Sequence, residues 1–120
     1  MNMPEQFPAK LGQVLVVDDN PISTESMRQA LQLNFEVDSV DSGEACLERL
    51  AAESRLPDLI LLDIEMGGID GFETCRRLRE NFGMPVIFVT SHDDLPECIK
   101  AFDSGGDDFV VKPFDPEVLL

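Results

Sequence analysis

Acidic, hydroxyl and basic residues follow short apolar runs at four places in the chain. The acids Asp18 and Asp19 follow residues 14–17, Asp63 follows 59–62, Thr90 follows 86–89, and Lys112 follows 109–111. Carboxylates held close together repel one another and raise each other's pKa, and a divalent cation relieves that repulsion. Oxygen ligands without His or Cys favour Mg²⁺, Mn²⁺ or Ca²⁺. Phosphoryl transfer uses such a set, because its catalysis is positioning plus charge neutralisation.

These side chains meet only if the apolar runs are neighbouring strands. The runs are short, continuous and rich in Val, Ile and Leu, which is typical of parallel strands buried on both faces. A weaker strand is predicted over 35–40, and amphipathic helical patterns cover 21–33, 43–54, 71–82 and 95–102. The alternation predicts a doubly wound α/β sheet, in which the carboxyl ends of the strands form one crevice.

Length and composition narrow the functional classes. The 120 residues favour one domain, and the net charge of −15 argues against direct binding to nucleic acid or an anionic membrane. No apolar run approaches the roughly 20 residues of a membrane span, and the first residues lack a signal peptide, so we expect a cytoplasmic protein. Three separated cysteines, Cys46, Cys75 and Cys98, are expected to be buried free thiols.

Taken together, the motifs resemble those of response-regulator receiver domains of two-component signalling. They read VVDDN at 16–20, LLDIEMGGIDGFE at 61–73, VTS at 89–91 and DDFVVKPF at 107–114, so the resemblance spans about 13–117. It implies a flavodoxin-like fold with a five-stranded parallel sheet in the order 2-1-3-4-5.

The resemblance also implies roles. Asp63 looks like the phosphoacceptor, and Mg²⁺ or Mn²⁺ would bind Asp18, Asp19, Asp63 and the backbone carbonyl of Glu65. Thr90 and Lys112 resemble the pair that senses the phosphoryl group. Phe109 holds the position of the switch aromatic residue, and Glu65 and His92 hold positions that tune hydrolysis. The peptide bond between Lys112 and Pro113 resembles the family's cis bond.

One departure from the family pattern concerns the loop after Asp63. Gly67 stands where the family usually has proline, so we expect a slightly more mobile loop. Asp70 is predicted to cap the helix at Gly71, and Met66 to pack under the loop. We expect Asp107 and Asp108 to be loop acids outside the metal site.

The domain boundaries follow from the same patterns. Residues 1–12 are interpreted as a flexible leader and 13–120 as the receiver domain. Residues 115–120 resemble the start of a fifth helix that is cut short, so we expect the natural chain to continue, with a C-terminal output domain.

The sequence therefore predicts a phosphorylation-activated switch, not an enzyme, with at most slow self-dephosphorylation. The expected donor is a histidine kinase or a histidine phosphotransfer protein, and the expected readout is a changed output face or homodimer. Two alternatives stay open: a phosphatase or phosphotransferase of the haloacid-dehalogenase type, and a degenerate receiver that only binds proteins. The phosphatase type usually has a second Asp two residues after its nucleophile, whereas this chain has Glu65 at that position.

Overall fold

Nine helices and strands alternate along the residues that the computed structural model describes, 10–91 and 95–112. The strands are β1 (Gln13–Val17), β2 (Glu36–Val40), β3 (Leu59–Asp63), β4 (Val86–Thr90) and β5 (Asp108–Val111). The helices are α2 (Pro21–Leu31), α3 (Gly43–Ala52), α4 (Gly71–Leu78) and α5 (Leu95–Asp103). Several predictions fall outside the described residues. They concern residues 1–9 of the predicted leader, His92, Pro113 and the helix predicted to start in 115–120.

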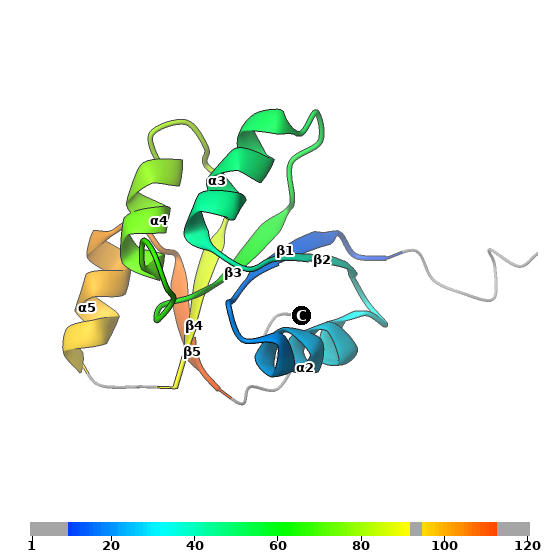
Figure 1. Ribbon diagram of the computed structural model, residues 1–120, viewed down its shortest axis with the longest axis horizontal. Helices are drawn as coiled ribbons and strands as arrows, with labels where there is room; N and C mark the ends of the chain where they lie inside the picture. The colour runs from blue at the N-terminus through cyan, green and yellow to red at the C-terminus, as the bar shows by residue number, and fades with distance from the viewer. Residues whose placement is uncertain (1–9, 92–94, 113–120) are drawn as a thin grey trace, which may run out of the picture.

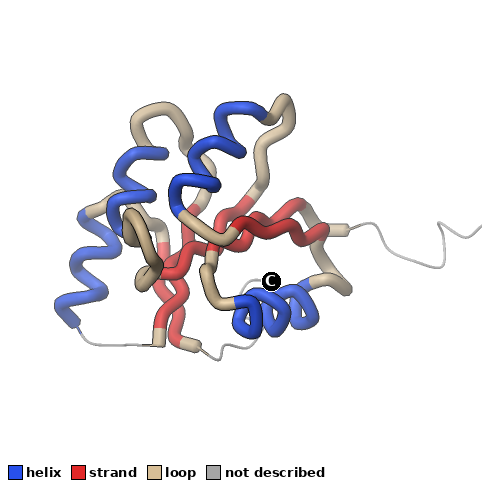
Figure 2. The backbone as a smooth tube through the Cα atoms, in the orientation of Figure 1, coloured by secondary structure: helices blue, strands red, loops and turns tan. Residues whose placement is uncertain are grey.

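The strands form one parallel sheet in the order β2-β1-β3-β4-β5, as predicted. Helices α3, α4 and α5 cover one face and α2 covers the other (Figures 1 and 2). In the described part of the chain, no helix has the length and apolar character that a bilayer crossing requires.

Successive strand residues point to opposite faces, and each face has its own core. Leu15, Ile60 and Leu62 belong to the larger core, which α3, α4 and α5 complete. Val16 and Leu61, from the same strands, belong to the smaller core under α2. This double burial explains why the strands read as continuous apolar runs.

Side-chain caps fix where the helices begin. The Asn20 carboxamide oxygen accepts hydrogen bonds from the Ile22 and Ser23 amides, and Pro21 occupies the first position of α2. Asp70 caps α4 as predicted, its carboxylate accepting from the Glu73 amide at 2.9 Å. These caps set the direction in which the chain leaves the carboxyl end of each strand.

Three helices end earlier than predicted, at Leu31, Ala52 and Leu78. The expected last turns are turn or irregular structure. Leu33, at the end of the first of them, is 83 % exposed, whereas Phe82, at the end of the last, packs against the larger core. In the amphipathic pattern over 43–54, Ala51 falls on the apolar side with Leu47 and Leu50, yet it is exposed.

The orientation of α5 also corrects the prediction. In the amphipathic pattern over 95–102, Ile99 and Phe102 fall on the apolar side, which predicts that they face the core, yet they are 52 % and 53 % exposed. Among the side chains of α5 that the structure describes, the buried one is that of Ala101, which joins the larger core. The small side chain lets α5 lie close to the sheet. Asp108, predicted as a loop acid, is the first residue of β5.

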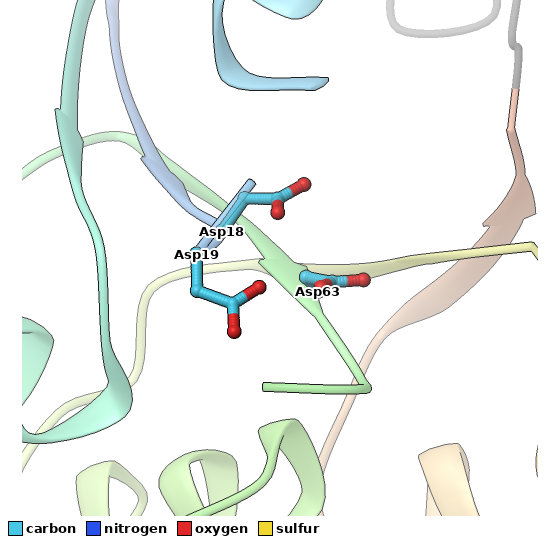
Figure 3. A group of neighbouring side chains, drawn as sticks. All are labelled: Asp18, Asp19 and Asp63. Atoms are coloured by element: carbon cyan, nitrogen blue, oxygen red, sulfur yellow. The ribbon is translucent and has the colours of Figure 1, made fainter. Parts of the chain in front are cut away.

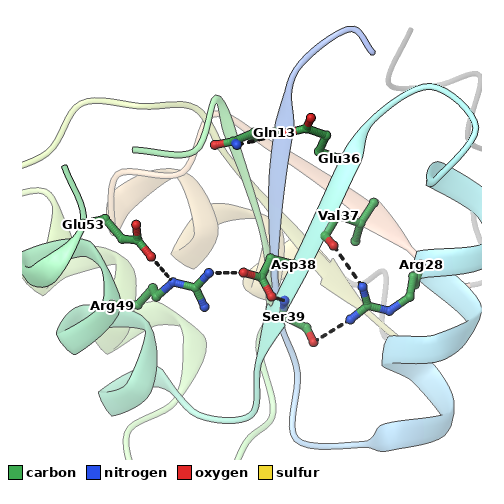
Figure 4. Close-up of polar contacts among 8 residues, drawn as sticks. All are labelled: Gln13, Arg28, Glu36, Val37, Asp38, Ser39, Arg49 and Glu53. Atoms are coloured by element: carbon green, nitrogen blue, oxygen red, sulfur yellow. Dashed lines mark hydrogen bonds and ion pairs between the residues drawn. The ribbon is translucent and has the colours of Figure 1, made fainter. Parts of the chain in front are cut away.

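The edge strand β2 is flanked by arginines from the helices on both faces (Figure 4). From α2, Arg28 donates to the Val37 carbonyl and the Ser39 hydroxyl, each at 2.9 Å. From α3, Arg49 forms an ion pair with Asp38. Charged side chains along an edge discourage pairing with another chain's strand, so this edge is protected.

Candidate functional site

The register of the sheet brings the predicted site residues together at the carboxyl ends of the strands. Because β1 pairs with β3 in parallel, Asp18 and Asp63 leave neighbouring strands side by side. The ends of β4 and β5 adjoin in the same way, and the Lys112 amide donates to the Thr90 carbonyl at 2.7 Å. Residues that are distant in sequence therefore share one crevice.

Three carboxylates meet at the ends of β1 and β3 (Figure 3). Asp18, Asp19 and Asp63 each present one oxygen, and these atoms lie within 4.8 Å of one another. The Asp18 side chain is fully buried, that of Asp63 is 10 % exposed, and Asp19 is exposed. Two buried acids beside a third form a set of hard oxygen donors, which fits a divalent cation of the Mg²⁺ type.

Lys112 supplies positive charge to the same cluster. Its ammonium lies 2.9 Å from Asp18 Oδ2 and 3.5 Å from Asp63 Oδ1. The other oxygen of Asp18 accepts a hydrogen bond from the Asn20 amide at 2.9 Å. Asp18 therefore has a partner on each oxygen, and its negative charge is compensated although it is buried.

Asp63 is less well compensated. Burial, followed by repulsion from Asp18, raises the pKa of the Asp63 carboxyl from 3.8 to about 6, although Lys112 opposes the shift. A buried, imperfectly compensated carboxylate gains from any added cation, because the cation stabilises its ionised form. The ionised form is the one that can act as a nucleophile.

The loop from β3 to α4 lies close to its neighbours at two glycines, Gly68 and Gly71. A Cβ on Gly71 would lie 2.3 Å from the Asp63 carbonyl oxygen, so α4 begins directly against the backbone of the site. Gly68 has φ +76°, a conformation that side chains rarely adopt. A side chain at position 71 would therefore meet the backbone of Asp63, and one at position 68 would meet the Glu44 carboxylate.

The remaining predicted residues surround this crevice. Thr90 is buried at the end of β4, and Phe109 is half-buried opposite Phe88 and packs against the larger core. Glu65 is exposed and lines a cleft of about 490 Å³ together with Asp19. Met66 is half-buried against the larger core, as predicted. His92 lies outside the described residues.

Two contacts of this region were not predicted. The Ile69 amide donates to Glu44 Oε2 at 3.2 Å, and the Gly67 amide donates to Asp19 Oδ2 at 3.1 Å. Each joins segments that are far apart in sequence, and nothing in the local pattern signals either bond. The Asn20 cap did carry a signal, because Asn before Pro is typical of a helix start.

Comparison with known families shows to which family this fold belongs. The model of the response regulator receiver domain matches residues 14–120. The chain belongs to the response-regulator receiver family. It is thus a signalling domain of two-component systems, which confirms the resemblance of its motifs.

Similar receiver domains occur in longer proteins. The chain is 39 % identical over 109 residues to the heme response regulator HssR of Staphylococcus aureus, covering 90 % of this chain and 48 % of that protein. It is 37 % identical over 109 residues to the response regulator MprA of Mycolicibacterium vanbaalenii, covering 89 % and 46 %. The receiver domain thus spans about half the length of these curated relatives.

Solved receiver structures superpose well. The BeF3-activated receiver domain of Klebsiella pneumoniae RstA matches with a TM-score of 0.81 at 31 % identity, covering 89 % of this chain and 91 % of that one. The BeF3-activated DrrB receiver domain matches with a TM-score of 0.79 at 31 % identity, covering 91 % of each.

Proposed function

We propose that this receiver domain accepts a phosphoryl group on Asp63 and thereby switches its interaction with a partner. The carrying observation is the arrangement around Asp63, a nearly buried carboxylate beside Asp18 with the Lys112 ammonium 3.5 Å away. A merely structural acid at a strand end has no need of a second buried acid and a shared lysine. The proposed donor is the phosphorylated histidine of a kinase or of a phosphotransfer protein.

In the proposed reaction, a carboxylate oxygen of Asp63 attacks the phosphorus of the phosphohistidine. A phosphorus–oxygen bond forms while the phosphorus–nitrogen bond breaks, and the imidazole keeps the electron pair and takes up a proton. Lys112 lies where its charge can neutralise the phosphoryl oxygens, and Thr90 can donate its hydroxyl hydrogen to one of them. The product is an acyl phosphate on Asp63.

The proposed cofactor is Mg²⁺, with Mn²⁺ as an alternative. Asp18, Asp19, Asp63 and the backbone carbonyl of Glu65 would hold it. When bound, such a cation neutralises charge on the carboxylates and on the incoming phosphoryl group. The oxygen-only donor set and the raised pKa of Asp63 support this assignment.

The proposed readout begins with the added charge, roughly −1.5 to −2 at neutral pH. Thr90 and Lys112 would be drawn toward it, and Phe109 would change its packing against the larger core. Glu65 and His92 would tune the lifetime of the acyl phosphate. The longer relatives support a C-terminal output domain as the receiver of the signal, either directly or through a homodimer.

The proposed activity is that of a signalling switch, not a turnover enzyme, with at most slow self-dephosphorylation. The net charge of −15 supports a basic protein surface as the partner, with no direct contact to nucleic acid or membrane. We further propose a cytoplasmic location, a leader over residues 1–12, and a receiver domain over 13–120.

Phosphorylation by acetyl phosphate tests the proposal. With Mg²⁺, intact-mass measurement should show the addition of one phosphoryl group to the wild-type chain and none to Asp63→Asn. With EDTA, the adduct should be lost. Asp41→Asn, which removes an exposed acid beside the crevice, is the matched control and should be modified like the wild type.

Three results would contradict the proposal. If Asp63→Asn acquires the adduct as readily as the wild type, Asp63 is not the acceptor. If the chain hydrolyses many phosphoester molecules per site, the domain acts as a phosphatase. Absence of any adduct, with beryllofluoride also failing to bind, would support a receiver that only binds proteins.

A further inference from the structure

A backbone amide of the β3–α4 loop contacts one acid of the carboxylate cluster. The Gly67 N–H donates to Asp19 Oδ2 at 3.1 Å, across 48 residues of sequence. Asp19 is the exposed member of the cluster, so its side chain is the one with the most freedom to turn away from the other two.

Neither space nor backbone conformation requires glycine at position 67. A Cβ built on Gly67 meets no atom within 4 Å, and its φ is not positive, in contrast to that of Gly68. Most residues would therefore fit here and keep the amide hydrogen. Proline, which the resemblance leads one to expect at this position, has no amide hydrogen to donate.

The loop that carries the Gly67 amide is also held on its other side, at Gly68 and Ile69. Glu44, in the first turn of α3, accepts a hydrogen bond from the Ile69 amide at 3.2 Å. The Glu44 carboxylate also lies against Gly68, where a Cβ would come within 2.6 Å of it. With the loop held two residues away, the Gly67 N–H is a directed donor.

We propose that the Gly67 amide is a positioning group for Asp19 that strengthens binding of a divalent cation at the carboxylate cluster. A carboxylate has two oxygens, so Asp19 can accept from Gly67 on Oδ2 and still offer Oδ1. Holding the side chain in place lowers the entropy lost when it binds a cation. Hydrogen bonds from outside the ligand set commonly orient ligating carboxylates in this way. The inference rests on the proposed cation site.

Calorimetric titration with MgCl₂ alone tests the inference. Gly67→Pro removes the donor, and Gly67→Ala keeps it while also limiting the backbone, so Gly67→Ala is the matched control. We expect Gly67→Ala to bind Mg²⁺ at least as tightly as the wild type. Gly67→Pro should bind roughly 3- to 10-fold more weakly than Gly67→Ala, the size expected for one lost hydrogen bond. Equal affinities of the two variants would overturn the inference.

A double-mutant cycle shows whether Gly67 acts through Asp19. In an Asp19→Ala background, replacing Gly67 by Pro or by Ala should give the same Mg²⁺ affinity, because the acceptor is absent. A persisting difference would assign the effect to loop geometry and contradict the positioning role.

A spectroscopic readout does not depend on Gly67→Pro folding. The ¹H–¹⁵N signal of the Gly67 amide should shift upfield in Asp19→Ala, and in the wild type its exchange with solvent should stay slow as Mg²⁺ is added. Faster exchange on saturation would mean that Mg²⁺ binding releases the bond, which overturns the inference. If the wild type shows no Mg²⁺ binding by heat or by shifts, the proposed cation site fails and not the Gly67 contact alone.

Discussion

A nearly buried carboxylate such as Asp63 costs folding free energy while it is ionised. The pKa of about 6 expresses this cost, because the folded chain holds the proton of Asp63 more tightly than the unfolded chain does. Each oxygen of Asp18 has a partner, Lys112 or the Asn20 amide, whereas Asp63 lies 3.5 Å from the Lys112 ammonium, which is 2.9 Å from Asp18. The site therefore lowers stability at the residue that we propose as the nucleophile.

Replacing Asp63 should stabilise the metal-free protein in a pH-dependent manner. Well below pH 3.8 the Asp63 carboxyl is protonated in both folded and unfolded chains. Between the unfolded value of 3.8 and the folded value of about 6, the folded chain binds more protons, so wild-type stability falls as pH rises. In EDTA, we expect the free energy of unfolding of Asp63→Asn to exceed that of the wild type by roughly 2–3 kcal/mol at pH 7.

Urea unfolding of both chains at pH 4 to 8 measures this difference. It should be small near pH 4, grow through pH 6 and stay constant above it. Saturating Mg²⁺ should reduce it, because the cation stabilises the ionised wild type. A difference that is independent of pH would show that Asp63 is not destabilising through its charge.

The sequence predicted that the carboxylates and Lys112 lie near one another, because the carboxyl ends of neighbouring parallel strands lie on the same side of the sheet. It could not foresee which acid would be well compensated, since that depends on distances of a few ångströms between Lys112, Asp18 and Asp63. The bond from Gly67 to Asp19 was equally hidden, because a backbone donor has no sequence signature.

At the end of the β3–α4 loop, Gly71 determines how closely α4 approaches Asp63. Gly71 allows the first turn of α4 to lie against the Asp63 backbone, and its amide donates to the Ile64 carbonyl at 2.9 Å. A side chain at this position would push the helix away from the strand end. Glycine is thus needed at this position for the first turn of α4 to approach the end of β3.

Gly71→Ala should destabilise the domain by about 1–3 kcal/mol, because a Cβ 2.3 Å from the Asp63 carbonyl oxygen forces the backbone to move. Urea unfolding compares it with Gly83→Ala, whose Cβ meets no atom within 4 Å. The control should lie within about 0.5 kcal/mol of the wild type. Equal stability of the two variants would refute the close-approach explanation.

Elements were predictable in kind and order, and less so at their ends. Strands β1 and β3 and the starts of α2, α3 and α4 follow from apolar runs and caps. The end of α4 does not, because Arg79 stabilises the turn that follows by donating to the Met84 and Gly105 carbonyls and pairing with Asp107. Asp107 was predicted as a plain loop acid, and its partner lies 28 residues away.

Across the whole molecule, 24 acidic residues outweigh 9 basic ones. Arg49 at the β2 edge pairs with nearby acids, but the net charge of −15 leaves an excess of carboxylates. Their mutual repulsion destabilises the folded chain. Salt weakens this repulsion, since the Debye length falls from about 30 Å at 0.01 M to about 10 Å at 0.1 M.

Monovalent salt should therefore stabilise the domain. Raising KCl from 0.01 to 0.5 M in EDTA should increase the free energy of unfolding on the order of 1 kcal/mol, or about 4 °C in Tm. Choline chloride should act alike if screening is the cause. Stabilisation by Mg²⁺ with no response to either monovalent salt would instead place the whole electrostatic cost at the carboxylate cluster.

The ion pair between Lys112 and Asp18 joins residues 94 positions apart. Both ends of the receiver domain must therefore be made and folded before the crevice contains its full set of charges. In a nascent chain Lys112 is the last of these residues to be made, and a locally unfolded chain does not hold it beside Asp63. A kinase that needs this arrangement would thus pass signals only to finished molecules, and the proposed phosphorylation would also act as a check on the integrity of its target.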